Sequence, residues 1–223
     1  FMNGRLKANP EIRVVAFDCD GVMFDSADAN RAFYNDILRR MGRAEMTPAQ
    51  FAYTHMHAVL DSIAHLFPDP AERDQAHTCR MGINYEQFIP IMRMAPYLKP
   101  LLQNLRRRYK TAVATNRTDT MPRVMSDHGL EGYFDLVVSA ADVRRPKPHP
   151  EPLRYAAGEL GAAIADCVVI GDSASDIKAA KAAGCVCVCV RYGYNQGMNL
   201  SELEPDYLAD DFAGGVAYAL GER

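Results

Sequence analysis

Five stretches of the chain are nearly continuous in apolar and β-branched residues. They cover residues 12–17, 111–115, 135–139, 167–171 and 185–190. A strand inside a parallel sheet is covered on both faces, so it is apolar along its whole length rather than at every second position. The pattern therefore predicts buried strands of a parallel sheet.

Helical patterns lie between most of these stretches. Residues 96–109 carry leucines at steps of three and four positions, and shorter helical segments are expected at 119–128, 151–160 and 175–183. Glycines end the last three segments, as is common at helix C-termini. Because strands and helices alternate, we predict an α/β fold with a Rossmann-like, doubly wound parallel sheet.

The interval from residue 25 to residue 95 interrupts this alternation. It holds helical patterns at 27–41, 48–66, 71–80 and 85–94, without a convincing strand. We therefore predict two domains, an α/β core made of residues 1–24 and 96–223 and an inserted all-helical domain made of residues 25–95.

Composition adds constraints on partners and location. The 223 residues are 48% hydrophobic and carry a formal net charge of −3, which gives no electrostatic reason to bind nucleic acid or an anionic membrane. Apolar runs all fall well short of the roughly 18 residues that span a bilayer. Four of the six cysteines fall in apolar stretches, where a thiol acts as a small hydrophobe. We expect a cytoplasmic protein, either a monomer or a homodimer.

The first strand runs directly into Asp18-Cys19-Asp20-Gly21. Carboxylates two positions apart on an extended segment project to the same side and repel unless a cation or a shared proton lies between them. The carboxyl end of a strand in an open α/β sheet is also where ligands bind. Taken alone, the pattern is equally typical of a solvated turn or a calcium loop.

Asp172 and Asp176 form a second acidic pair, which follows the apolar strand 167–171. Ser and Asp are common helix N-caps, so Asp176 has a purely structural interpretation in the first turn of the next helix. That interpretation does not explain Asp172, which comes directly after an apolar strand.

Thr115, Asn116 and Lys147 complete the set of candidates. Thr115 and Asn116 end a strand with a hydroxyl and an amide that could hold phosphate oxygens, although ordinary turn chemistry is the better explanation of this motif taken alone. Lys147 lies in a loop stiffened by Pro146, Pro148 and Pro150, which could aim its ammonium at a phosphate. Taken alone, this segment is equally typical of a surface loop with solvated cations.

The order of these motifs along the chain is more specific than any one of them. Asp18 and Asp20, then Thr115, then Lys147, then Asp172 and Asp176 resemble the motif series of the haloacid dehalogenase-like superfamily over nearly the whole chain. The helical insertion after the first motif resembles the C1-type cap of subfamily I. The resemblance implies that the strands before Asp18, Thr115 and Asp172 lie side by side.

The resemblance also implies a mechanism. Asp18 would attack phosphorus and form an aspartyl-phosphate, and Asp20 would act as the acid and base. Asp18, the backbone carbonyl of Asp20 and Asp172 would hold Mg²⁺, with Asp176 ordering the shell around the metal. Thr115, Asn116 and Lys147 would bind the phosphate oxygens.

Several activities occur on this scaffold, so the fold alone does not decide the reaction. Dehalogenases of the family lack the second aspartate, which is present here as Asp20. Phosphonatases use a cap lysine, and residues 25–95 contain none. We expect a phosphatase similar to phosphoglycolate phosphatases that acts on a small phosphorylated metabolite. A β-phosphoglucomutase-like sugar phosphomutase remains the alternative, and a catalytically silent regulatory or binding protein is disfavoured because the motifs are intact.

The cap should determine which substrate is accepted. The segment that contains His55 and His57 falls where such caps present specificity residues. We expect one of the two histidines to contact the part of the substrate that is not phosphate. The competing interpretation places both on a solvated helix face.

Overall fold

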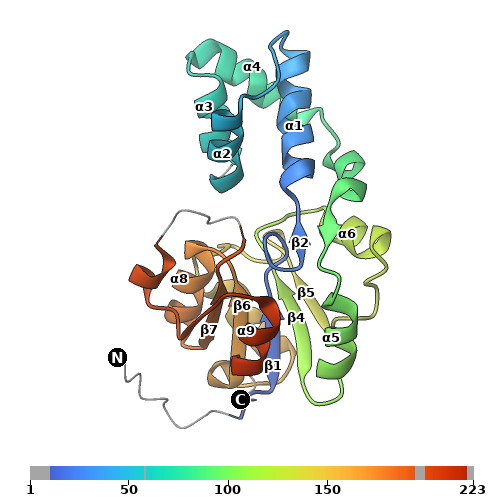
Figure 1. The fold of residues 1–223 in the computed structure, drawn as a ribbon, viewed down its shortest axis with the longest axis vertical. Coiled ribbons are helices and arrows are strands. Elements are labelled where there is room, and N and C mark those ends of the chain that lie inside the picture. Colours follow the sequence, from blue (N-terminus) through green and yellow to red (C-terminus); the bar gives the residue numbers. More distant parts are fainter. Residues whose placement is uncertain (1–10, 58, 194–198, 220–223) are drawn as a thin grey trace. The chain divides into compact units, whose positions relative to one another are not determined.

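The structure is a computed structural model that describes residues 11–57, 59–193 and 199–219. The chain divides into two compact units (Figure 1). The core unit consists of Phe1–Phe24 and Met94–Arg223, and the insertion unit consists of Asp25–Arg93.

A six-stranded parallel sheet forms the centre of the core unit. Its spatial order is β5 (Leu136–Val138), β4 (Lys110–Ala114), β1 (Val14–Phe17), β6 (Cys167–Gly171), β7 (Val186–Val190) and β8 (Tyr207–Ala209). The predicted α/β class with a doubly wound parallel sheet is confirmed. Strand β8 was not predicted, because three residues at the sheet edge, one of them an exposed tyrosine, make no continuous apolar run.

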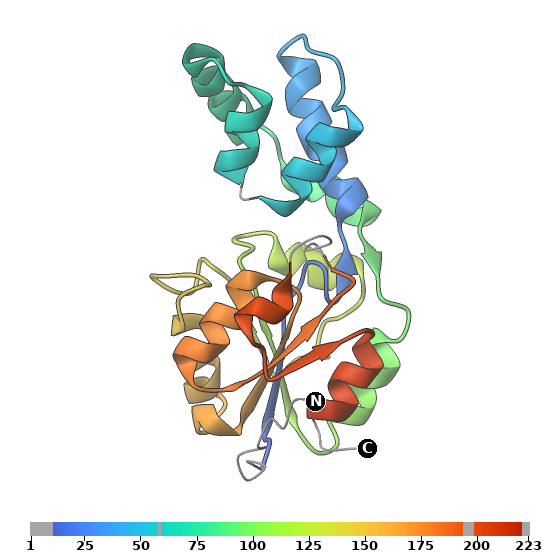
Figure 2. The same cartoon turned by 60° about the vertical axis from the view of Figure 1, so that its left-hand side comes forward.

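Helices cover both faces of this sheet, as Figures 1 and 2 show. Val14 and Ala16 of β1 share a cluster with side chains of α7 (Glu151–Glu159) and α8 (Ala174–Ala183). Phe17 instead stacks on Phe212 of α9 (Phe212–Ala219), with ring centroids 5.7 Å apart. Helix α5 (Leu98–Leu105) packs on β4, and α6 (Met121–Asp127) precedes β5 in the chain. Cover on both faces explains why the strands are apolar throughout.

The path of the chain through the sheet creates a switch point beside β1. From β1 the chain moves outward to β4 and β5, and it then returns to β6 on the other side of β1. Crevices that bind ligands form outside the carboxyl ends of strands at such a point. Residues that follow β1 and β6 are therefore placed together by topology alone.

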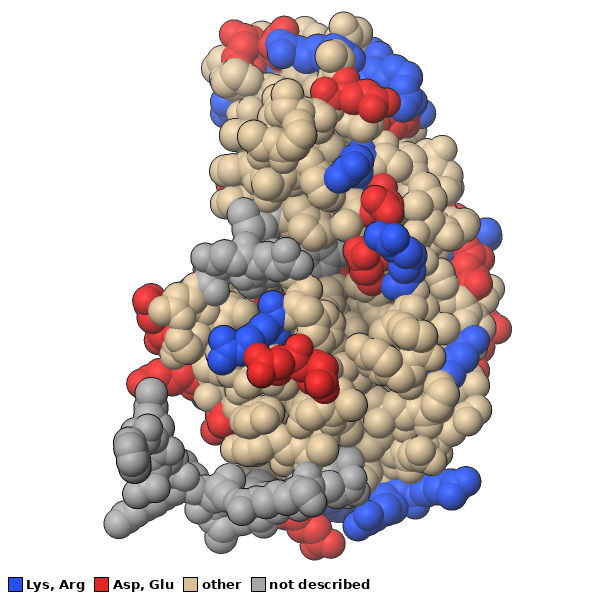
Figure 3. Space-filling view, viewed as in Figure 1, with Lys and Arg blue, Asp and Glu red and all other residues tan. Residues whose placement is uncertain are grey.

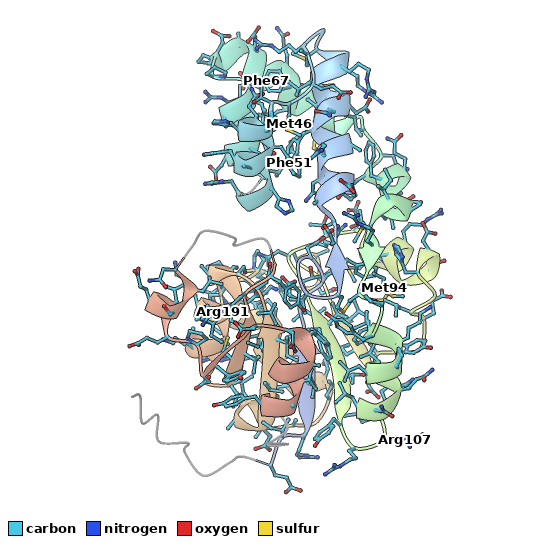
Figure 4. All side chains as sticks on the ribbon, in the orientation of Figure 1. Met46, Phe51, Phe67, Met94, Arg107 and Arg191 are labelled. Atoms are coloured by element: carbon cyan, nitrogen blue, oxygen red, sulfur yellow. The ribbon has the colours of Figure 1, made fainter. Side chains whose placement is uncertain are left out.

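The insertion unit is built from helices. They are α1 (Ala27–Arg40), α2 (Pro48–Met56), α3 (Val59–Leu66), α4 (Pro70–Met81) and the 3₁₀ helix η1 (Tyr85–Ile91). Phe33 contacts the rings of Tyr34, Tyr85 and Phe88 edge-on, and in Figure 4 the side chains of Met46, Phe51 and Phe67 lie between α1 and the other helices.

Two boundaries within the insertion differ from the sequence pattern. The single helical stretch expected at 48–66 is two helices, because His57 adopts an extended backbone after α2. The helix expected at 85–94 is the 3₁₀ helix η1, which contains Pro90, followed by strand β3 (Arg93–Met94). Proline lacks the N–H that a continuing α-helix needs. Strand β3 pairs with β2 (Phe24–Asp25).

One face of the molecule carries charges of both signs (Figure 3). On the face drawn in Figure 3, Lys and Arg side chains are interspersed with Asp and Glu side chains. Among the residues that the structure describes, none of the helices combines the length and the apolar character needed to cross a bilayer.

Candidate active site

Three aspartates meet at the switch point of the core unit. Asp18 directly follows β1, Asp172 directly follows β6, and Asp176 lies in the first turn of α8. Each offers a carboxylate oxygen, and these oxygens all lie within 4.8 Å of one another. Asp172 and Asp176 are buried, with 1% and 0% of their surface exposed. Three carboxylates this close repel one another unless a cation or a shared proton compensates their charge.

Lys147 supplies one positive charge to this cluster. Its Nζ lies 2.9 Å from Oδ1 of Asp18 and 2.6 Å from Oδ1 of Asp176, and its side chain is 2% exposed. Burial alone would lower the pKa of the ammonium, but Asp176 and Asp18 outweigh burial and raise it. Lys147 is therefore a fixed cation beside Asp18.

The loop that carries Lys147 is tied to the end of β4 by Asn116. The side-chain amide of Asn116 donates to the backbone oxygen of Lys147 at 2.8 Å, and its Oδ1 accepts from the backbone N–H of Lys147 at 3.0 Å. Both polar atoms of the Asn116 side chain therefore bind the backbone of the loop that carries Lys147. The contact between Asn116 and phosphate stays a prediction, and sequence reasoning did not foresee this second duty.

Asp176 joins the cluster to the start of α8. Its Oδ2 accepts from the hydroxyl of Ser173 at 2.5 Å and from the backbone N–H of Ser173 at 3.1 Å, in a capping box. Its Oδ1 accepts from Lys147. Asp176 therefore helps to cap α8 and is also part of the charged cluster. Since both oxygens have protein donors, Asp176 fits the role of ordering the site better than that of a direct metal ligand.

Two glycines make room for the carboxylates. A Cβ on Gly171 would lie 2.3 Å from Cβ of Asp176, and a Cβ on Gly193 would lie 2.0 Å from Oδ2 of Asp172. Neither distance is compatible with a side chain. Gly193 was not among the residues that the sequence suggested, because nothing in its local pattern shows that the chain there passes against Asp172.

Burial and neighbouring charges affect Asp18 strongly. Burial raises the pKa of its carboxyl, Lys147 lowers it, and Asp176 and Asp20 raise it, with a net value of about 7. Oδ1 of Asp18 also accepts the backbone N–H of Cys19 at 2.7 Å. When ionised, the three carboxylates of Asp18, Asp172 and Asp176 carry more negative charge than the single ammonium of Lys147 neutralises. A hard divalent cation with oxygen ligands fits this donor set.

Asp20 lies in a tight loop after β1. Gly21 has φ = 79°, and its N–H donates to the oxygen of Phe24 at 2.8 Å. A left-handed backbone at this position favours glycine. Both carboxylate oxygens of Asp20 are bound by the guanidinium of Arg117, at 2.6 and 2.7 Å. Arg117 was not predicted, since a single arginine in a loop carries no periodic signal.

Thr115 follows β4 at the same edge of the sheet. It is 2% exposed, its N–H donates to the oxygen of Val138 at 3.0 Å, and its Oγ1 accepts the backbone N–H of Arg117 at 3.2 Å. Register places β4 directly beside β1, so Thr115 follows a strand that neighbours the one before Asp18. Its contact with phosphate stays a prediction.

His55 and His57 belong to the insertion unit. The ring of His57 stacks on Tyr53 with centroids 3.8 Å apart, and its Nδ1 lies 2.8 Å from the backbone oxygen of Tyr53. His65 stacks on Tyr53 as well, at 3.9 Å. His55 stacks on Phe51 at 5.3 Å. His57 is exposed and His55 is partly buried, so the solvated-face interpretation describes His57 better than His55. Contact of either residue with a substrate stays a prediction.

Comparisons with known proteins show the family to which the chain belongs. The family model described as haloacid dehalogenase-like hydrolase matches residues 15–190, and the chain belongs to this family. It is 28% identical to a phosphoglycolate phosphatase of Haemophilus influenzae (strain 86-028NP) over 218 residues, which cover 92% of this chain and 97% of that protein.

Further relatives cover the chain to a similar extent. A phosphoglycolate phosphatase of Neisseria meningitidis is 30% identical over 215 residues, covering 88% of this chain and 89% of the other. The crystal structure of a HAD-superfamily hydrolase, subfamily IA, variant 1, from Geobacter sulfurreducens matches with a TM-score of 0.80 and 33% identity. That match covers 97% of this chain and 100% of the other.

Proposed function

We propose that this hydrolase is a Mg²⁺-dependent phosphatase that removes phosphate from a small phosphorylated metabolite. The observation that carries the proposal is the cluster of Asp18, Asp172 and Asp176 around Lys147, at the carboxyl ends of β1 and β6. Two of the three relatives named above are phosphoglycolate phosphatases, which supports a phosphoglycolate-like or sugar phosphate substrate.

Asp18 is the proposed nucleophile. Lys147 and the N–H of Cys19 both hold Oδ1 of Asp18, which fixes the rotation of the carboxylate. A carboxylate oxygen attacks phosphorus, the bond from phosphorus to the leaving oxygen breaks, and an aspartyl-phosphate forms. Water then attacks that phosphorus and releases Asp18.

Asp20 is the proposed proton carrier in both steps. It gives a proton to the leaving oxygen in the first step and takes a proton from the attacking water in the second. Lys147, Thr115 and Asn116 are proposed to hold the phosphate oxygens. Mg²⁺, held by Asp18, Asp172 and the backbone carbonyl of Asp20, would neutralise negative charge on the phosphate when bound.

Free thiols support a reducing, cytoplasmic location. All six cysteines are free and five of them are buried. Burial raises the pKa of Cys185 and Cys189 to about 12, so these thiols behave as inert core residues.

Hydrolysis of p-nitrophenyl phosphate tests the activity. We expect turnover with Mg²⁺ and its loss when a chelator is added. A panel of phosphorylated metabolites, with phosphoglycolate, sugar phosphates and nucleotides, then identifies the substrate. Conversion of β-glucose 1-phosphate to glucose 6-phosphate tests the phosphomutase alternative. Turnover that persists in chelator would overturn the role of the metal, and mutase activity above hydrolysis would overturn the phosphatase assignment.

A further inference from the structure

The pair formed by Arg117 and Asp20 joins two residues that are 97 positions apart in the chain. Nε of Arg117 donates to Oδ2 of Asp20 at 2.6 Å, and a terminal nitrogen donates to Oδ1 at 2.7 Å. The planar guanidinium matches both oxygens of one carboxylate, so the contact fixes the direction of the carboxylate plane as well as its distance.

Arg117 is itself held on several sides. Its side chain is 10% exposed, and that of Asp20 is 26% exposed. Its backbone N–H donates to Oγ1 of Thr115 at 3.2 Å, and its backbone oxygen accepts from Ala140 at 2.8 Å. Its second terminal nitrogen donates to Oγ1 of Thr120 at 3.3 Å. An exposed ion pair contributes little to stability when both side chains must be ordered to form it. The side chain and backbone of Arg117 are held by contacts other than the one with Asp20, so this pair needs less ordering.

We propose that Arg117 is a positioning residue that orients Asp20 for proton transfer. The inference rests on the proposed phosphatase function. As the bond from phosphorus to the leaving oxygen breaks, the proton of the Asp20 carboxyl moves to that oxygen, and Asp20 becomes a carboxylate. In the second step, Asp20 takes a proton from water while the bond from water oxygen to phosphorus forms and the bond to Asp18 breaks. Because the guanidinium binds both oxygens of Asp20, the proposal requires that one of these two bonds opens while Asp20 carries the proton and that the other keeps the carboxyl group in place.

This role makes a prediction that depends on the leaving group. Nitrophenolate is a stable anion and leaves without a proton, whereas phenolate leaves more readily when an acid protonates it. The ratio kcat/KM covers the steps up to departure of the leaving group. A residue that acts only through the acid Asp20 therefore affects phenyl phosphate much more than p-nitrophenyl phosphate.

The experiment compares Arg117→Met with wild-type protein on these two esters, in saturating Mg²⁺. We expect kcat/KM to fall about 10- to 100-fold for phenyl phosphate and less than about threefold for p-nitrophenyl phosphate. Arg117→Lys keeps the charge but loses the fork, so it should recover only part of the loss. Arg123→Met is the matched control, because Arg123 makes an exposed pair with Asp127 on α6. It should leave both ratios unchanged.

A double-mutant cycle separates positioning from general damage. Asp20→Asn should show the same dependence on the leaving group, and adding Arg117→Met to it should cost less than about twofold more. Equal losses on both esters, full additivity with Asp20→Asn, or unchanged activity of Arg117→Met would each overturn the proposal. Wild-type protein that hydrolyses neither ester would overturn the phosphatase function itself.

Discussion

The charged cluster at the switch point of the core unit and the ion pairs of the insertion unit differ in how exposed their side chains are. In the core unit, Lys147 and Asp176 are buried and joined at 2.6 Å, with Asp18 attached to the same ammonium. In the insertion unit, Arg39 and Arg40 both pair with Asp36 on the outside of α1, and Arg93 pairs with Asp25 and Asp28 where all three side chains are at least 48% exposed.

This difference suggests that the core cluster carries out the reaction and that the insertion unit affects which substrate is preferred. Exposed ion pairs contribute about 0–1 kcal/mol each and tolerate substitution, whereas removal of one partner from a buried pair leaves an uncompensated charge that costs about 3–5 kcal/mol. Substitutions in the core cluster should therefore abolish turnover of every substrate. Substitutions in the insertion should change which substrate is preferred.

The largest effect is expected at the nucleophile. Asp18→Asn should lower kcat for p-nitrophenyl phosphate by at least about 10³-fold, because the amide cannot form the aspartyl-phosphate. Lys147 keeps Asp176 as a partner in this variant, so the melting temperature should change little. Steady-state kinetics and thermal unfolding measure the two quantities. An active Asp18→Asn protein would contradict the covalent mechanism.

Lys147→Met should have the next largest effect, and it acts on both activity and stability. Three clustered carboxylates lose their only protein ammonium among the contacts described, and the free energy of unfolding should fall by about 3–5 kcal/mol in chelator. Mg²⁺ should recover more stability in this variant than in wild-type protein.

Lys110→Met provides the matched control for Lys147→Met. Lys110 pairs with Asp135 at 3.0 Å and is 59% exposed, so the loss should stay below about 1 kcal/mol. Denaturant unfolding with and without Mg²⁺ measures both variants. An equal loss of unfolding free energy in both variants would show that the buried position of Lys147 does not increase its contribution to stability.

Gly193→Ala should weaken Mg²⁺ binding about tenfold without abolishing activity at saturating metal. The added Cβ would lie 2.0 Å from Oδ2 of Asp172, so that carboxylate has to move. Loss of support around a metal ligand typically costs 10- to 100-fold in affinity. Gly158→Ala is the control, since a Cβ there meets no atom within 4 Å. The Mg²⁺ dependence of the rate gives the affinity, and an unchanged dependence would exclude contact between position 193 and a metal ligand.

The smallest effect is expected in the insertion unit. His55→Ala and His57→Ala should change the relative rates on a panel of phosphorylated metabolites by about 3- to 10-fold and leave p-nitrophenyl phosphate hydrolysis nearly unchanged. His65→Ala is the control, because His65 stacks on the same tyrosine as His57. Identical substrate profiles for all three variants would show that neither His55 nor His57 determines which substrate is preferred.

The core strands were predictable because burial on both faces leaves a direct mark on the sequence. Strand β8 left no such mark, since an edge strand of three residues is covered less completely. Within the insertion, the segment expected to be an α-helix is a 3₁₀ helix over Tyr85–Ile91, and Pro90 inside it is a sequence signal against a continuous α-helix.

Some residues of the candidate site were predictable from the sequence pattern and others were not. Asp18 and Asp172 follow apolar strands, so the sequence itself places them at one edge of a sheet. Arg117 and Gly193 matter only through contacts with Asp20 and Asp172, which are distant in the chain. Asn116 was predicted for its chemistry, but its hydrogen bonds to Lys147 depend on a loop conformation that no local pattern specifies.

Asp176 has a consequence for how this protein can change over time. One of its oxygens begins α8 through Ser173, and the other holds Lys147 beside the nucleophile. A substitution at position 176 that stabilises the start of α8 therefore also moves the ammonium of Lys147. A substitution that changes the position of this ammonium also destabilises the start of α8. Selection for heat resistance and selection for turnover act here on a single side chain. Libraries that vary positions 173 and 176 together should recover active variants more often than libraries that vary either alone.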